Sequence, residues 1–230
     1  GSPLCWVRSP VYGLRIRKFI RNGTRVFPNL ECSEYMTSEK NALVVDLDGT
    51  LIYSDVLMES FLGMLVRKPW LILFVPFWLL HGKAALKANI ARHSDIDAAL
   101  LPYNGELLAY LQQQKSAGRR LVLATASNQK FAVQIAAHLQ LFDDVLASDD
   151  QSNLAGKTKA QRIIDLLGNE NFCYAGNEVP DLKVWEHAKS AIIVGPKISQ
   201  LQKKLPAQCA VEKVFDYPAA GLKVYVKACR

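Results

Sequence analysis

The chain has 230 residues, of which 50% are hydrophobic and 21% are charged, so it can bury the core of one α/β domain with an insertion. The formal net charge is +7, but residues 1–35 hold six basic and two acidic side chains, and residues 197–230 hold seven and two. The residues between these ends are slightly acidic, which argues against a nucleic-acid partner for the central domain.

Residues 1–41 form a basic leader in which apolar and cationic side chains mix around residues 14–21. This pattern fits either a segment that lies on a membrane surface or a solvated tail. The five cysteines of the chain are scattered and include no C-x-x-C pair, which is typical of reduced thiols in the cytoplasm. No apolar run of about 18 residues is present, so no segment is expected to cross a bilayer as a helix.

The stretch A-L-V-V-D-L-D-G-T-L-I-Y-S, residues 42–54, carries the strongest chemical signal. Its apolar start is typical of a buried strand, which Gly49 and Thr50 then break. Asp46 and Asp48 would lie at the carboxyl end of that strand, where ligands bind in open α/β sheets. Two buried carboxylates repel each other unless a cation accompanies them. The pair therefore indicates a Mg²⁺-dependent catalytic site, or else an acidic cap at a strand-to-turn junction.

The motif D-L-D-G-T-L resembles the first motif of the haloacid dehalogenase-like phosphohydrolases. The resemblance implies a doubly wound α/β fold, with Asp46 as the nucleophile, Asp48 as the general acid and base, and Mg²⁺ as the cofactor. It also implies a helical cap that is inserted after the first strand, covers the active site and selects substrates.

The residues that match this cap, about 55–103, have helical periodicity. They include the string P-W-L-I-L-F-V-P-F-W-L-L at residues 69–80, which is too short to span a bilayer and which Pro76 should kink. Trp70 and Trp78, with basic residues on both sides of the string, are typical of a membrane interface. The alternative is a helix buried against the main domain.

Five short apolar strands, at residues 43–45, 121–124, 145–147, 172–175 and 191–194, alternate with helices. This alternation predicts a parallel, doubly wound sheet. The predicted core spans residues 42–196, and residues 197–230 are interpreted as a basic extension.

Two later positions match further motifs of the same family. Thr125, after the strand at 121–124, matches the hydroxyl that holds the phosphoryl group, and Ser127 is the alternative. Lys159, near a helix start, matches the lysine that faces the phosphate, and Lys157 is the alternative.

The fourth motif of the family, G-D-x-x-x-D, is matched by G-N-E-V-P-D at residues 176–181. Asn177 replaces the first Asp, a metal ligand in the family, and Asp181 keeps the second. The metal ligands that the resemblance implies are oxygens of Asp46, Asp48 (through its backbone carbonyl), Asn177 and Asp181. Because an amide carries no charge, we expect weaker Mg²⁺ binding, for which Glu178 could compensate.

Several strings, among them P-W-L-I-L-F-V-P-F-W-L-L-H-G-K, A-T-A-S and Y-A-G-N-E-V-P-D-L, resemble a narrower group. These are the phosphatase-like domains fused ahead of UbiA-type membrane prenyltransferases, where Gly-Asn is also found in the fourth motif. The resemblance implies that a membrane domain follows near residue 230 and that the protein lies at the cytoplasmic face of the membrane.

Together these patterns predict a Mg²⁺-dependent phosphatase that forms an aspartyl-phosphate at Asp46. The apolar cap favours a phosphate monoester that is lipid-linked or close to a membrane. One alternative is a weakly active or non-catalytic module that docks to or regulates a UbiA-type prenyltransferase. Another is a phosphotransferase, which uses the same residues but passes the phosphoryl group to an acceptor other than water.

Overall fold

The computed structural model describes residues 7–8, 15–16, 41–149, 152–169 and 171–217. The chain divides into two units, Gly1–Glu39 and Lys40–Arg230. In the first unit, the short strands β1 (Val7–Arg8) and β2 (Arg15–Ile16) pair in antiparallel fashion. The predictions for the rest of the leader, and for residues 218–230, lie outside the described residues.

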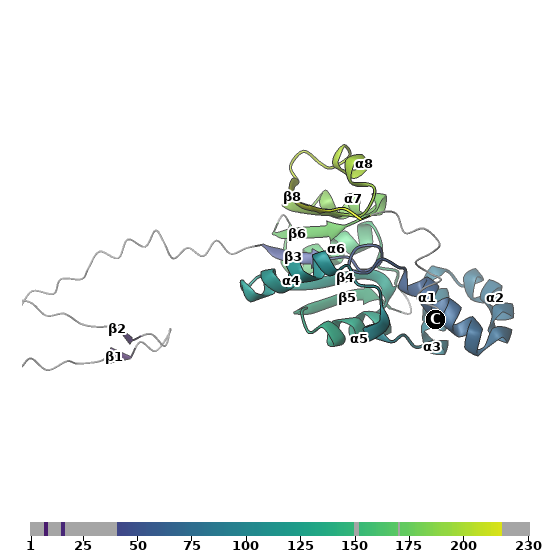
Figure 1. Ribbon diagram of the computed structural model, residues 1–230. Coiled ribbons are helices and arrows are strands. Elements are labelled where there is room, and N and C mark those ends of the chain that lie inside the picture. The colour runs from purple at the N-terminus through teal and green to yellow at the C-terminus, as the bar shows by residue number, and fades with distance from the viewer. Residues whose placement is uncertain (1–6, 9–14, 17–40, 150–151, 170, 218–230) are drawn as a thin grey trace, which may run out of the picture. The chain divides into compact units, whose positions relative to one another are not determined.

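The second unit is built on a parallel sheet to which the described residues contribute six strands, in the order β5-β4-β3-β6-β7-β8 (Figure 1). The strands are β3 (Ala42–Val45), β4 (Leu121–Asn128), β5 (Asp144–Ser148), β6 (Phe172–Gly176), β7 (Ser190–Val194) and β8 (Ala210–Phe215). The chain winds outward from β3 first to one side and then to the other, so the carboxyl end of β3 is a topological switch point. The predicted doubly wound sheet is confirmed.

Strand β3 is apolar throughout because helices cover both faces of the sheet. Leu43 and Val45 pack in one hydrophobic cluster with helices α4 (Gly105–Ser116) and α5 (Gln129–Leu139). Val44 points to the opposite cluster. That cluster includes side chains of α6 (Lys157–Leu167), α7 (Leu182–Trp185) and α8 (Ile198–Gln202).

The predicted helical cap is also present and follows β3 (Figure 1). It consists of α1 (Val56–Arg67), the 3₁₀ helix η1 (Pro69–Phe74), α2 (Val75–Leu80) and α3 (Lys83–His93). Asp55 caps α1 by accepting a hydrogen bond from the Met58 N–H at 3.1 Å. The chain returns to the sheet through η2 (Ala98–Leu100), and the Tyr53 N–H donates to the Pro102 carbonyl at 2.9 Å, which closes the insertion.

The string at residues 69–80 differs from its prediction. It is not one kinked helix but the pair η1 and α2, with Pro76 in the first turn of α2, where its missing N–H costs nothing. Trp70 is exposed, but Trp78 is buried in a small core inside the cap, so the prediction that both tryptophans lie at a surface was wrong for Trp78. Among the helices that the structure describes, none has the length and hydropathy needed to cross a bilayer.

The sheet extends beyond the predicted end of the core at residue 196. Strand β8 pairs with β7 from Ala210 to Phe215, although most of its side chains are exposed, and this exposure explains why its sequence lacks an apolar run. Tyr217, just after β8, donates a hydrogen bond to the carbonyl of Gly49. The segment after residue 196 therefore contacts the loop that carries Asp48.

Candidate active site

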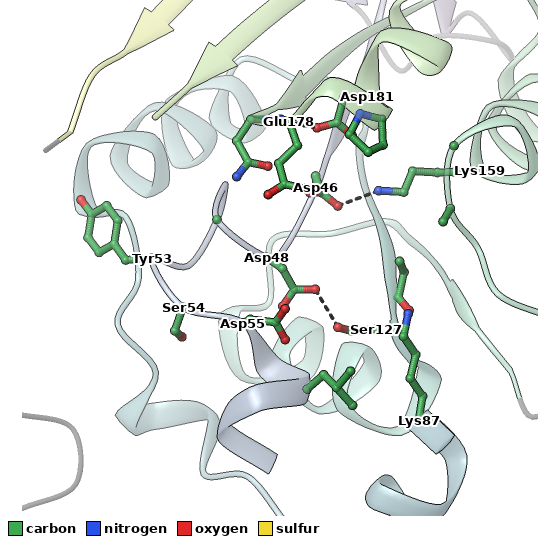
Figure 2. Close-up of a pocket in the computed structure, with 17 residues that line it drawn as sticks. Asp46, Asp48, Tyr53, Ser54, Asp55, Lys87, Ser127, Lys159, Glu178 and Asp181 are labelled. Carbon is green, nitrogen blue, oxygen red and sulfur yellow. Dashed lines mark hydrogen bonds and ion pairs between the residues drawn. The ribbon is translucent and has the colours of Figure 1, made fainter. Parts of the chain in front are cut away.

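A pocket of about 370 Å³ opens at the carboxyl ends of the central strands and is bordered by the cap (Figure 2). Because the carboxyl ends of parallel strands meet at one edge of a sheet, loops that are distant in sequence come together there. The lining includes Asp46 and Asp48 after β3, Ser127 at the end of β4, and Asn177 after β6. The pocket is thus the place where the predicted motifs meet.

Asp46 lies at this edge because β3 ends there and the Asp46 N–H donates to the Ala175 carbonyl at 3.0 Å. Its Oδ1 accepts a 2.7 Å hydrogen bond from Nζ of Lys159, and both side chains are buried (Figure 2). Lys159 is in the first turn of α6, whereas Lys157 is exposed and does not line the pocket. Of the two predicted lysines, the structure brings Lys159 to Asp46.

Charge in the pocket is only partly balanced. Burial raises the pKa of the Asp46 carboxyl to about 7; Lys159 opposes this rise, while Asp181 and Asp48 add to it. Burial alone would lower the pKa of Lys159, but Asp46 and Asp181 outweigh that effect and the net shift is upward. Lys159 is therefore cationic, and one lysine does not fully stabilise the ionised form of Asp46.

Asp48 is held by three donors. Its Oδ1 accepts from the N–H of Val56, the first residue of α1, at 2.8 Å. Its Oδ2 accepts from the hydroxyls of Ser127 at 2.7 Å and Thr125 at 3.4 Å. Burial raises the pKa of Asp48, and the nearby charge of Asp55 raises it further. A carboxyl with a raised pKa, fixed in one orientation, suits general acid and base chemistry.

The two hydroxyls predicted at the end of β4 occupy different environments. Thr125 is fully buried, does not line the pocket, and accepts a 2.9 Å hydrogen bond from the Ser127 N–H. Ser127 lines the pocket. β4 continues to Asn128 instead of ending at residue 124, and its register with β5 shifts over these last residues. Ser127 is therefore the hydroxyl that can reach a ligand, and Thr125 supports the loop.

Asp181 is buried at the end of the 3₁₀ helix η3 (Val179–Asp181). Its Oδ2 accepts the backbone N–H groups of Asn177 and Glu178, both at 3.0 Å, and its Oδ1 accepts the Tyr174 hydroxyl at 2.8 Å. Tyr174 in turn accepts a 3.1 Å hydrogen bond from Lys159. Tyr174 thus joins Lys159 to Asp181, a role that sequence reasoning missed because a tyrosine in an apolar strand is typical of a core residue.

Asn177 lines the pocket and contacts the loop at residues 49–50, which follows Asp46. Its Oδ1 accepts from the Thr50 hydroxyl at 3.2 Å. Gly49 has a φ of +70°, and a Cβ at that position would lie 2.1 Å from Nδ2 of Asn177. The positive φ and the close approach of the Asn177 amide therefore favour glycine where the first and fourth motifs meet.

The donor set of the pocket fits Mg²⁺, which prefers carboxylate and carbonyl oxygens. Within the described residues, no three His, Cys, Asp or Glu side chains are arranged to hold a metal ion. Mg²⁺ commonly needs only one or two carboxylates, because water and phosphate complete its shell. Asp181 already accepts three hydrogen bonds from the protein, so Asp46 is the more available carboxylate.

Lys87 is a second cation of the pocket that sequence reasoning missed (Figure 2). It comes from α3 of the cap, and its Nζ donates to the Ala126 carbonyl at 2.6 Å and to Oδ1 of Asn153 at 2.8 Å. Burial lowers its pKa, while the charges of Asp48 and Asp55 oppose this. A helix lysine is so common that nothing in the sequence distinguished it.

Comparison with known proteins agrees with this geometry. The model of the family described as haloacid dehalogenase-like hydrolase matches residues 43–178. The uncharacterized protein y4nM of Sinorhizobium fredii (strain NBRC 101917 / NGR234) is 36% identical over 211 residues, which are 91% of this chain and 40% of that protein. The chain therefore spans less than half the length of this relative.

Solved structures share the fold at low identity. A substrate-bound phosphoserine phosphatase complex has a TM-score of 0.52 at 13% identity, and the match covers 82% of this chain and 97% of that one. A probable phosphoserine phosphatase from Vibrio cholerae has a TM-score of 0.52 at 14% identity, and the match covers 82% of this chain and 64% of that one. A protein of unknown function from Bordetella pertussis Tohama I has a TM-score of 0.55 at 15% identity, and the match covers 74% of this chain and 97% of that one. Since the family model matches more than half of the sequence, the chain belongs to the haloacid dehalogenase-like hydrolases.

Proposed function

We propose that the protein is a phosphatase that hydrolyses a phosphate monoester through an aspartyl-phosphate on Asp46. The observation that carries this proposal is the buried pair of Asp46 and Lys159, with the separately held carboxyl of Asp48 beside it. Such an arrangement provides a nucleophile, a cation for the phosphoryl oxygens and a proton donor within one pocket.

In the first step, a carboxylate oxygen of Asp46 attacks phosphorus, and the bond from phosphorus to the leaving oxygen breaks. Asp48, in its protonated form, donates the proton that the leaving oxygen needs. The raised pKa of Asp48 supports this role. Lys159 offsets negative charge on the phosphoryl oxygens, and the Ser127 hydroxyl, which lines the pocket, holds Asp48 in place by donating its proton to Oδ2.

In the second step, water attacks the phosphorus of the aspartyl-phosphate. Asp48, now ionised, accepts the proton of that water, phosphate is released and the Asp46 carboxylate is restored. Mg²⁺, when held by oxygens of Asp46, Asp48, Asn177 and Asp181, would supply positive charge that offsets the negative charge on the phosphoryl oxygens. The uncharged Asn177 makes us expect weak Mg²⁺ affinity.

The cap supports a substrate with both a polar and an apolar part. Leu57 of α1 and Lys87 of α3 line the pocket, so the cap contributes an apolar side chain and a cation to its wall. We propose a lipid-linked or membrane-adjacent phosphate ester as the substrate.

The second candidate is a weakly active module that docks to or regulates a membrane prenyltransferase of the UbiA type. Asn177 favours it, since one negative charge fewer weakens the metal site. A phosphotransferase stays a third proposal, and it differs only in the acceptor of the second step.

The test is phosphate release from an aryl phosphate and from a polyprenyl-linked sugar phosphate, each with Mg²⁺ and with EDTA. We expect Mg²⁺-dependent release, lost in Asp46→Asn and kept in Asp165→Asn, whose carboxyl is exposed on α6. Release that survives in Asp46→Asn would refute the nucleophile. No release from either ester would favour the docking module.

A further inference from the structure

The side of the cap formed by residues 66–80 exposes eight large apolar side chains. We name this surface the cap face. Val66, Leu73 and Leu80 are the most exposed, at 85%, 78% and 84%. Figure 1 shows α2, which carries part of it, on the side of the cap that lies away from the sheet. Soluble monomers rarely expose so many large apolar side chains within 15 consecutive residues, and exposed apolar surfaces of this kind mark binding sites.

The exposed side chains of the cap face are not explained by a missing core inside the cap, because the cap has a packed core of its own. The same string also supplies Leu71 and Trp78, which turn inward and pack with Met64 and Ile90. The sequence is therefore apolar on both sides of η1 and α2, although the cap core needs only one side. The outward side chains require a separate explanation.

The charges around the cap face identify the kind of partner. The chain has no acidic residue between Glu59 and Asp95. Arg67 and Lys68 precede the string and Lys83 follows it, and all three side chains are exposed. An apolar centre flanked by these basic residues complements a bilayer that contains anionic lipids, and one exposed carboxylate, that of Asp95, lies within range of the charges of Arg67 and Lys68.

We propose that the cap face docks on an anionic membrane surface. The apolar side chains of η1 and α2 enter the boundary between headgroups and acyl chains, and Arg67, Lys68 and Lys83 meet the headgroups. At 12 residues, η1 and α2 together are too short to span the bilayer, so the segment lies in the interface. This docking does not depend on whether the pocket is catalytic.

The test is co-sedimentation of the 230-residue protein with phosphatidylcholine vesicles, with and without phosphatidylglycerol. The matched variants are Leu73→Glu and Leu100→Glu, because both leucines are 78% exposed and both lie in 3₁₀ helices, Leu100 outside the cap face. We expect Leu73→Glu, and Leu80→Glu as a second variant, to weaken binding to the anionic vesicles about tenfold or more. Leu100→Glu should change binding less than about twofold, and circular dichroism should show the same fold in all variants.

Three results would overturn the proposal. One is the absence of binding to anionic vesicles by the unaltered protein. Another is equal binding by Leu73→Glu and Leu100→Glu, which would place the membrane contact elsewhere in the chain. The third is that the unaltered protein does not bind vesicles but self-associates in a concentration-dependent way, and that Leu73→Glu abolishes this association. The cap face would then bind a second copy of the chain.

Discussion

The buried pair of Asp46 and Lys159 gives the sharpest prediction. Lys159→Met removes the cation and keeps a side chain of similar length. Both partners are buried, and their charged atoms are 2.7 Å apart. Removing one partner of a buried ion pair costs about 3–5 kcal/mol when the other charge stays uncompensated.

Protonation of Asp46 limits that cost, and this makes the effect depend on pH. A carboxyl with a raised folded-state pKa stabilises the fold fully below its unfolded-state value, and this contribution is lost as the pH rises through the folded-state pKa, here about 7. Without Lys159 the pKa rises further, so the variant continues to lose stability above pH 7 by up to about 1.4 kcal/mol per pH unit. We expect a destabilisation of about 1–2 kcal/mol at pH 6 and about 3 kcal/mol at pH 8.

Urea unfolding in EDTA at the two pH values measures this difference. Lys157→Met is the matched control, since Lys157 is exposed in the same turn of α6, and it should change stability by less than about 0.5 kcal/mol. Phosphate release should be lost in Lys159→Met and kept in Lys157→Met. Equal stability of the two variants at pH 8 would show that the pair does not form as described.

Three further predictions concern Asn177, Ser127 and Glu212. Asn177→Asp should tighten Mg²⁺ binding about tenfold or more by adding a negative charge, as calorimetric titration would show; unchanged affinity would place Asn177 outside the metal site. Ser127→Ala should lower kcat about tenfold or more and move the limb of the pH–rate profile that Asp48 controls toward higher pH, because the 2.7 Å hydrogen bond from Ser127 lowers the pKa of Asp48; an unaltered profile would refute this. Glu212 of β8 accepts hydrogen bonds from Arg119, Tyr110 and Ser190, and these lower its pKa to about 2 although burial opposes its ionisation. Glu212→Gln should therefore cost about 1 kcal/mol at neutral pH, and the difference should vanish as the pH falls toward 2; a difference that persists in acid would contradict it.

The sequence alone predicted the five strands from β3 to β7, the parallel sheet and the helical cap, but not β8 or the division of residues 69–80 into two helices. The run at residues 42–45 is buried on both faces, so it is apolar throughout, and Asp46 follows it directly. Since parallel strands end at one edge of the sheet, the positions of Asp46, Asp48, Asn177 and Asp181 in one pocket follow from the predicted topology.

The tertiary structure decided which of two neighbouring candidates faces the site. Lys157 and Lys159 differ by about 200° around a helix, and only packing of α6 against the sheet sets which one points inward. The same holds for Ser127 against Thr125, where a register shift at the end of β4 selects the serine.

Residues whose roles depend on distant partners left no local signal. Tyr174 looks like a core residue until Lys159 and Asp181 are placed beside it. Lys87 looks like a helix-surface lysine until the cap closes over β4. Periodicity and turn residues are local and determine helices and strands, whereas the direction of a side chain depends on how elements distant in sequence pack together.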